Sequence, residues 1–444
     1  MIKASKPSSR VAILLAVFAC IYCPSQSSNA QTQKASGFDK QRGHDMVSTV
    51  KSDLKKNYYD PGFHGIDIDA RFKQADEKIN TATSIGHIFG IIAQALTELE
   101  DSHTFFLPPG RSARTEYGWE MQMIGDQCFV TAVQPGSDAE AKGLKEGDEI
   151  WKIDNFVPTR DNFWKIQYYF HALRPQPGMQ LIVKKPSGKE EQLVIAARIT
   201  PLKRVVDLTS GDIFDLIRDA ENSARLNRQR YLEMGDELFI WKMPHFELEE
   251  QEIDSLMGKV RKRKALILDL RGNGGGYVVT LQRLAGYFFD HDVKIADRKG
   301  RKEMKPQVAK TRGDKVFNGK LVVLVDSRSA SAAEIFARLV QLEHRGTVLG
   351  DRSAGAVMES RHFPHQSGVD VVAFWGLSIT DADVIMGDGK SLEKSGVTAD
   401  ETLLPTAADL AAKRDPLLAR AAELLGIKLK SDTAGALFPI EWRK

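Results

Sequence analysis

The sequence predicts an α/β fold whose C-terminal half is built on a mainly parallel sheet. Strand-like apolar runs at residues 237–241 and 265–270 flank a segment, residues 249–260, in which apolar side chains recur at helical spacing. A third apolar run, residues 321–325, leads directly into another helical segment, and residues 346–350 form a fourth. Such alternation is typical of βαβ units that build a parallel sheet.

Length and composition are those of an ordinary globular protein with two or three domains. The chain has 444 residues, of which 42% are hydrophobic and 27% are charged, and its formal net charge is +3. The basic run at residues 261–264 directly precedes a strand-like segment, and no aromatic side chains interleave its charges. A solvated turn explains this run, so nucleic acid is not expected as a partner.

Residues 1–30 have the three-part layout of a secretory signal peptide. Three basic residues precede the uncharged residues 11–22, and polar residues then lead to a small-x-small site that ends at Ala30. The apolar stretch is short for a membrane span. We therefore expect cleavage after Ala30, export to the periplasm or the extracellular space, and no membrane span in the mature chain.

The cysteines agree with this expectation. Cys20 and Cys23 would leave with the signal peptide, so Cys128 would remain without a disulfide partner. Lipidation of Cys20 is an alternative, which the bulky Phe18 two residues earlier disfavours.

Residues 31–112 are expected to form a helical segment. Apolar side chains recur at helical spacing within residues 46–54 and 85–99, and prolines and glycines interrupt the pattern between them. The second helical pattern is followed by Glu-Asp-Ser-His-Thr, residues 100–104. A histidine just beyond a helix end more often binds carbonyl groups or lies in a polar rim than takes part in catalysis.

Residues 113–200 consist of short β-like runs separated by turns. They include PGSDAEAKGLKEGDEIWKID, residues 135–154, which resembles a PDZ domain in the order and spacing of its turn, helix and strand. The resemblance implies a groove in which an extended peptide adds as a strand, with its C-terminal carboxylate held near Tyr117, Gly118 and Trp119. A β module that merely packs against the core is the alternative.

The predicted core, residues 201–430, has two turns at strand-to-helix junctions, and a C-terminal tail, residues 431–444, follows it. The first turn, RGNGGG at residues 271–276, permits positive φ angles and close approach of a ligand to the backbone. It lacks the spacing of a nucleotide-binding loop and better fits an anion-binding nest.

The second junction places Ser331 between a strand and the first free N–H groups of a helix, a position that suits an oxyanion. Ser331 and Glu334 also fit a capping box, in which the serine only closes its own helix, and spacing alone favours this cap.

Six motifs occur in the order found in the C-terminal processing (tail-specific) peptidases and their tricorn-core relatives: LEDSHTFF, the PDZ-like stretch, DLRGNGGG, SRSASAAEIFA, VLGDRSAGA and LEKSGVTAD. The resemblance implies a crotonase-like or ClpP-like α/β core with a helical N-terminal segment and an inserted β-rich PDZ-like domain. It further implies that Ser331 is the nucleophile, with the N–H groups of Ala332 and Gly275 as the oxyanion hole.

The chain departs from the commoner branch of this family, in which a lysine about two dozen residues after the serine is the base. Ala356 stands at that place, and no lysine follows Ser331 before Lys390. The tricorn-like branch, which this chain resembles more closely, implies a relay from Glu393 through Ser102 to His103 and Ser331. No acidic or cysteine partner completes a metal site with His362 and His365, and no cofactor is expected.

Three hypotheses follow. The first is an exported serine endopeptidase that binds C-terminal or unfolded tails of proteins and cleaves them through an acyl-enzyme. The missing lysine motivates the second, a catalytically degenerate peptidase-like scaffold or adaptor that uses only its PDZ groove. The third, acyl-CoA chemistry on a crotonase-like core, is disfavoured by the peptide-binding module and the signal peptide.

Overall fold

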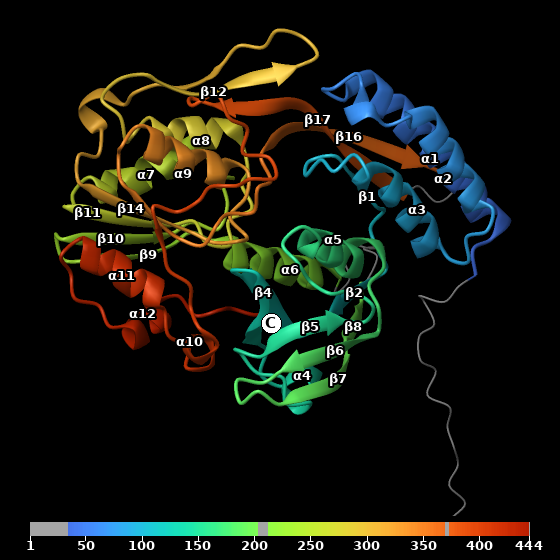
Figure 1. The fold of residues 1–444 in the computed structure, drawn as a ribbon, viewed down its shortest axis with the longest axis horizontal. Coiled ribbons are helices and arrows are strands. Elements are labelled where there is room, and N and C mark those ends of the chain that lie inside the picture. Colours follow the sequence, from blue (N-terminus) through green and yellow to red (C-terminus); the bar gives the residue numbers. More distant parts are fainter. Residues whose placement is uncertain (1–33, 203–211, 369–372, 444) are drawn as a thin grey trace, which may run out of the picture.

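The computed structural model describes residues 34–202, 212–368 and 373–443, so the predicted signal peptide lies outside the described residues. An N-terminal helical unit, a β-rich unit and a layered core follow one another along the chain (Figure 1). No helix in these three ranges has both the length and the apolar character that a bilayer span requires.

Three helices form the N-terminal unit: α1 (Gly37–Asn57), α2 (Ile68–Ile79) and α3 (Ile85–Thr97). Each begins after a polar residue, Ser36, Asp67 or Ser84, whose side chain accepts an N–H of the first turn. Their apolar faces share one buried cluster with β17 (Ala373–Met386) of the core. This cluster fixes the helical unit to the core.

The β-rich unit is an antiparallel sheet in the order β3-β4-β5-β6-β7, so β3 is an edge strand. Its strands are β3 (Trp119–Ile124), β4 (Gln127–Val133), β5 (Glu149–Ile153), β6 (Gly178–Lys184) and β7 (Glu190–Ala196). Helices α4 (Asp138–Ala141) and α5 (Phe163–Tyr168) accompany them. The chain enters and leaves through a ribbon of β2 (Ala113–Glu116) and β8 (Arg198–Pro201).

The core is built on a six-stranded sheet in the order β18-β15-β14-β11-β10-β9. All neighbours pair in parallel except β9, which is an antiparallel edge strand. The strands are β9 (Arg230–Met234), β10 (Leu238–Lys242), β11 (Ala265–Asp269), β14 (Lys320–Val325), β15 (Thr347–Gly350) and β18 (Glu401–Thr402). The expected α/β class and the mainly parallel sheet are thereby confirmed.

Helices cover both faces of this sheet (Figure 1). Helices α7 (Glu250–Val260), α8 (Val278–Ala285) and α9 (Ala332–Leu342) lie on one face, and α11 (Pro416–Leu424) and α12 (Ser431–Leu437) lie on the other. In β14, Val323 packs toward the first group and Leu324 toward the second. Burial on both faces explains why these strands read as continuous apolar runs rather than as alternating ones.

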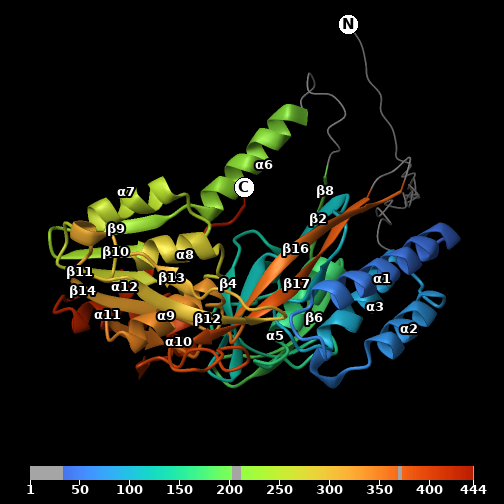
Figure 2. The same cartoon turned by 90° about the horizontal axis from the view of Figure 1, so that it is seen from above.

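A second, antiparallel sheet brings the end of the helical segment to the core. It contains β1 (Phe105–Leu107), β12 (Val293–Gly300), β13 (Gln307–Ala309), β16 (Met358–Ser367) and β17. Strands β16 and β17 extend from the core to the N-terminal helices (Figure 2). Because β1 pairs with β17, His103 is placed beside the core, although more than 200 residues separate β1 from β17 in the sequence.

Two features differ from the pattern of the sequence. The sequence predicts one amphipathic helix over residues 407–425, but the structure has two, α10 (Ala407–Ala411) and α11, because Pro416 cannot continue a helix and Asp415 caps the next one. The charged composition of residues 201–236 predicts a link between the PDZ-like domain and the core, but this stretch contains α6 (Asp212–Asn227) and the edge strand β9.

Candidate active site

Ser331 lies between the carboxyl end of β14 and the start of α9, at the predicted junction. Its backbone has φ 55° and ψ −119°, a conformation that residues other than glycine rarely adopt. The N–H of Ser331 donates to the carbonyl of Ala356 at 2.9 Å. Strained residues of this kind persist only where surrounding contacts hold them, and they cluster at functional sites.

The buried carboxylate of Glu334 fixes the turn around Ser331. It accepts hydrogen bonds from four donors: the N–H groups of Ser331, Gly355 and Ala356 and the hydroxyl of Ser353. Burial raises the pKa of Glu334 to about 7, against the lowering effect of these donors. Glu334 thus reaches back to Ser331 as in a capping box and also holds the turn of residues 353–356 against it.

The glycine turn also lies against Ser331. A Cβ on Gly275, whose φ is 99°, would stand 2.7 Å from the Cβ of Ser331, so the contact requires glycine. The N–H of Gly275 donates to Asn273 Oδ1 at 2.8 Å, whereas the N–H of Ala332 has no partner among the described residues. Ala332 is therefore free to bind an oxyanion, and Gly275 can contribute only if Asn273 releases it.

Ser102, His103 and Glu393 form a hydrogen-bonded chain. His103 Nδ1 lies 2.7 Å from Ser102 Oγ, and that hydroxyl donates to Glu393 Oε2 at 2.9 Å. The N–H of Ser102 donates to Glu393 Oε1 at 2.9 Å. These hydrogen bonds join Ser102 and Glu393, which are 291 positions apart in the sequence.

This arrangement selects one form of the imidazole. The Ser102 hydroxyl has one proton, which it donates in the hydrogen bond to an ionised Glu393. The same hydroxyl can therefore only accept a hydrogen bond from His103, so Nδ1 carries the proton and Nε2 has the lone pair. Burial lowers the pKa of His103, against the raising effect of Asp101, and burial raises the pKa of Glu393. A neutral imidazole with a free Nε2 is the form that accepts a proton.

Ser331 and the hydrogen-bonded chain of Ser102, His103 and Glu393 both contact the backbone at Ala356 and Val357. The carbonyl of Ala356 accepts the N–H of Ser331, and the N–H of Val357 donates to Glu393 Oε2 at 2.8 Å. Within the described chain, no hydrogen bond joins the side chains of Ser331 and His103. Such bonds often form only when a substrate is bound, so the separation is compatible with a nucleophile and its base.

Asp101 holds the Ser102–His103 turn, and the sequence interpretation missed it. Asp101 is only 2% exposed. Its Oδ1 accepts the N–H of His103 at 2.9 Å and the hydroxyl of Thr380 at 2.6 Å, and its Oδ2 accepts the hydroxyl of Tyr58 at 3.0 Å. An aspartate two residues before a turn residue often binds its N–H, which was the available sequence signal.

The edge strand β3 contacts the loop that precedes Ser331. The amide of Gln122 donates to Asp326 Oδ2 at 2.8 Å, and the hydroxyl of Ser327 donates to the carbonyl of Met123. Arg328 pairs with Glu120, its guanidinium 3.3 Å from the carboxylate. The β-rich unit therefore lies directly against the turn that carries Ser331.

The loop predicted to bind a carboxylate lies at the start of β3. Gly118 has φ 73°, and a Cβ there would meet Ser137 at 2.5 Å. The N–H groups of Tyr117 and Gly118 have no hydrogen-bond partner in the described part of the chain, and Trp119 is buried as the first residue of β3. The geometry permits an anion-binding nest at this point.

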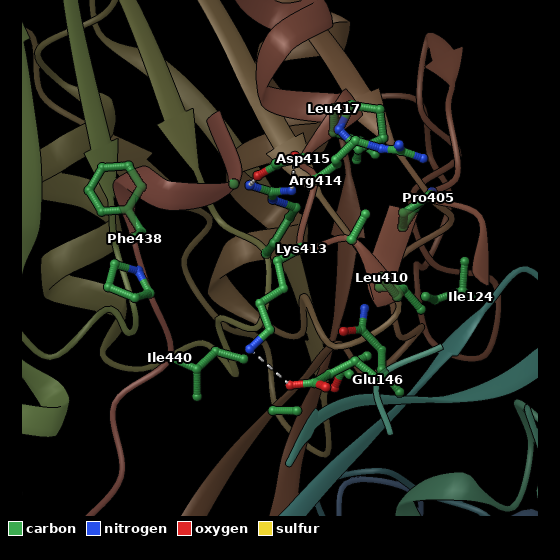
Figure 3. Close-up of a pocket in the computed structure, with 18 of the residues that line it drawn as sticks. Ile124, Glu146, Pro405, Leu410, Lys413, Arg414, Asp415, Leu417, Phe438 and Ile440 are labelled. Atoms are coloured by element: carbon green, nitrogen blue, oxygen red, sulfur yellow. Dashed lines mark hydrogen bonds and ion pairs between the residues drawn. The ribbon is translucent and has the colours of Figure 1, made fainter. Parts of the chain in front are cut away.

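A cavity of about 750 Å³ separates the β-rich unit from the C-terminal helices (Figure 3). Ile124 and Glu146 of the β-rich unit line it together with Leu410 and Leu417, and Lys413 forms an ion pair with Glu146 (Figure 3). Asp326 also lines it, so the cavity extends to the loop before Ser331.

His362 and His365 both lie on β16. His365 Nε2 binds Asp53 at 2.7 Å and connects β16 to α1. No cluster of three potential metal ligands occurs among the residues that the structure describes.

Comparisons with known proteins agree with this architecture. The model of peptidase family S41 matches residues 240–403, and that of the PDZ domain matches residues 110–162. A tail-specific protease of Haemophilus influenzae is 25% identical over 342 residues, which are 72% of this chain and 46% of that protein. A carboxyl-terminal-processing protease of Picosynechococcus is 25% identical over 70% of this chain and 72% of its own length. This chain thus spans about half the length of the first relative and more of the second.

The crystal structure of mature CPAF has the same fold. It superposes with a TM-score of 0.62 at 15% sequence identity, over 84% of this chain and 94% of that one. The expected fold is confirmed: an α/β core is preceded by a helical N-terminal segment, and a PDZ domain lies between the two in the sequence.

Proposed function

Since the chain belongs to peptidase family S41 and contains a PDZ domain, we propose that it is an exported serine endopeptidase that binds C-terminal or unfolded tails of proteins. One observation carries the proposal: Ser331 and the Ser102–His103–Glu393 chain converge on Ala356 and Val357. The relatives named for tail-specific and carboxyl-terminal processing support the substrate class.

In the proposed reaction, Ser331 Oγ attacks the scissile carbonyl while His103 Nε2 takes its proton. The oxyanion accepts the N–H of Ala332 and one N–H of the glycine turn, with Gly275 as the first candidate once Asn273 releases it. His103 then protonates the leaving amine, which leaves an acyl-enzyme on Ser331. Water, deprotonated by His103, hydrolyses the ester.

The proposal assigns the chain to the Ser-His-Ser-Glu branch. Ala356 stands where the other branch has its lysine, and its backbone touches Ser331, so that place holds no base. Ser102 and Glu393 orient His103 and stabilise the imidazolium that forms.

Two substitutions test the assignment. Ser331→Ala and His103→Ala should each lower the cleavage of an unstructured polypeptide by at least about a thousandfold, because nucleophile and base act as one unit. Ser52→Ala and His291→Ala, both at exposed positions, are the matched controls and should retain full activity. Cleavage that survives either active-site change would contradict the proposal.

A scaffold that only binds tails is the second candidate, favoured by the absence of the family lysine. A scaffold should bind an unfolded protein equally well before and after Ser331→Ala and should release no products. Mass spectrometry of the incubated polypeptide separates the two functions, since new termini that require Ser331 arise only from an endopeptidase.

Export is tested separately. The N-terminus of the protein recovered outside the cytoplasm should be Gln31, the residue that follows Ala30. An intact Met1 on cytoplasmic protein would contradict export.

A further inference from the structure

The outer edge of β3 can accept another strand. In an antiparallel pair, backbone groups alternate between the partner strand and the open side. The carbonyl of Met123 points to the open side, since it accepts the hydroxyl of Ser327, and the alternation places the backbone groups of Met121 and Trp119 on that side too. A peptide added here would pair with residues 119–123.

The direction of such a peptide follows from the loop before β3. The unpartnered N–H groups of Tyr117 and Gly118 can hold a terminal carboxylate only at the beginning of the strand. The tail must therefore run antiparallel to β3, and its upstream residues point toward Met123. At Met123 the open edge ends, because Ser327 occupies the carbonyl there.

Ser327 is also the point where the edge strand meets the active site. It lies four residues before Ser331, and Asp326 and Arg328 on either side of it contact Gln122 and Glu120 of β3. A tail that leaves β3 at Met123 thus enters the turn that carries Ser331.

We propose that this arrangement measures the length of the substrate tail: the bond cleaved lies about five to nine residues upstream of the free C-terminus. The inference rests on the proposed peptidase function and adds to it a fixed distance between the bound carboxylate and the scissile bond.

The lower and upper limits of this distance, counted in residues from the free C-terminus, come from the geometry of β3 and of residues 327–331. Residues 119–123 pair with five residues of the tail, so no bond within those five can reach Ser331 while the carboxylate is bound. The four-residue step from Ser327 to Ser331 spans at most about 14 Å. An extended tail covers that distance in about four further residues, at roughly 3.3 Å each.

The experiment uses unstructured peptides of one repeated sequence, lengthened at the C-terminus by one residue at a time. Product masses should show a cleavage site that moves with the C-terminus and stays about five to nine residues from it. The same peptides with an amidated C-terminus are the control, and they should lose this register because the nest no longer holds a carboxylate.

Two results overturn the inference. Frequent cleavage within the last four residues, or sites that keep a constant distance from the N-terminus, would show that no length is measured. An identical pattern in the acid and amide series would show the same. If neither the peptides nor an unfolded protein are cleaved at all, the proposed function itself fails, which is a distinguishable result.

Discussion

The carboxylate of Glu334 binds three backbone N–H groups and so connects the turn at Ser331 to the turn of residues 353–356. We expect Glu334→Gln to lower the free energy of unfolding by about 1–3 kcal/mol, because an amide has one acceptor oxygen and would leave buried N–H groups unpaired. Its kcat should fall by at least about tenfold with little change in KM, since the turn holding Ser331 would shift. Urea denaturation and steady-state kinetics measure both.

Glu343→Gln is the control for this change, because Glu343 ends the same helix but is exposed. It should leave stability and kcat unaltered. A Glu334→Gln variant with normal kcat would show that the four hydrogen bonds do not position Ser331 for cleavage.

The protonation of His103 should set the acid limit of activity. Since the proposed base must be neutral and burial lowers its pKa, activity should persist as pH falls and be lost only below the usual histidine range near 6.5. The exposed His362 also lowers the pKa of His103, so His362→Gln should move the acid limit toward higher pH. The pH profile of kcat/KM measures both effects, and a limit above pH 7 in the unaltered protein would contradict the assignment.

Among the helices and strands, the sequence predicted those that have a clear apolar pattern of their own. Strands β10, β11 and β14 are buried on both faces and read as apolar runs, and α7 and α9 follow from helical spacing. Strand β9 was missed because its alternating residues pack on only one side, at the edge of the sheet. The junction at Ser331 was therefore predicted correctly.

The rest of the candidate site depends on tertiary contacts that no local pattern contains. Asp101 is buried by Tyr58 and Thr380, which come from α1 and β17. The N–H of Gly275 donates to Asn273 Oδ1 within the same turn, and the spacing of the glycines does not predict this contact. Ser102, His103 and Glu393 were named from a family resemblance, because nothing in their local sequence distinguishes them from solvated turn residues.

In the turn of residues 353–357, Gly355 lies close to the backbone of Lys394. Gly355 has φ 73°, and a Cβ there would meet the backbone of Lys394 at 2.9 Å. Gly389 has φ 79° with nothing within 4 Å, so Gly389→Ala should cost only about 1 kcal/mol of backbone strain. Gly355→Ala should cost roughly 1–3 kcal/mol more and reduce cleavage, because Lys394 and Glu393 must move. Equal effects of the two substitutions in thermal unfolding would show that this contact is not tightly packed.

At the scale of the whole molecule, a buried ion pair fixes the PDZ domain to the core. Arg160 and Asp351 lie 2.5 Å apart with side chains only 12% and 11% exposed, and Asp351 also accepts the N–H of Gly125. Asp351 begins the turn that continues to Ala356 beside Ser331. This contact and the contacts of β3 with residues 326–328 place the PDZ domain against both turns around Ser331.

Removing one partner of this pair should be worse than removing both. Arg160→Ala leaves Asp351 buried without its cation, so we expect a loss of about 3–5 kcal/mol at the interface, faster hydrogen exchange in β3 and residues 326–328, and reduced cleavage. Arg160→Ala with Asp351→Ala should recover part of the loss, because no unpaired charge remains. Arg198→Ala, which breaks an exposed pair with Glu116 inside the β2–β8 ribbon, should change neither exchange nor cleavage. If the double variant is no better than Arg160→Ala, the interface is held by packing rather than by this pair.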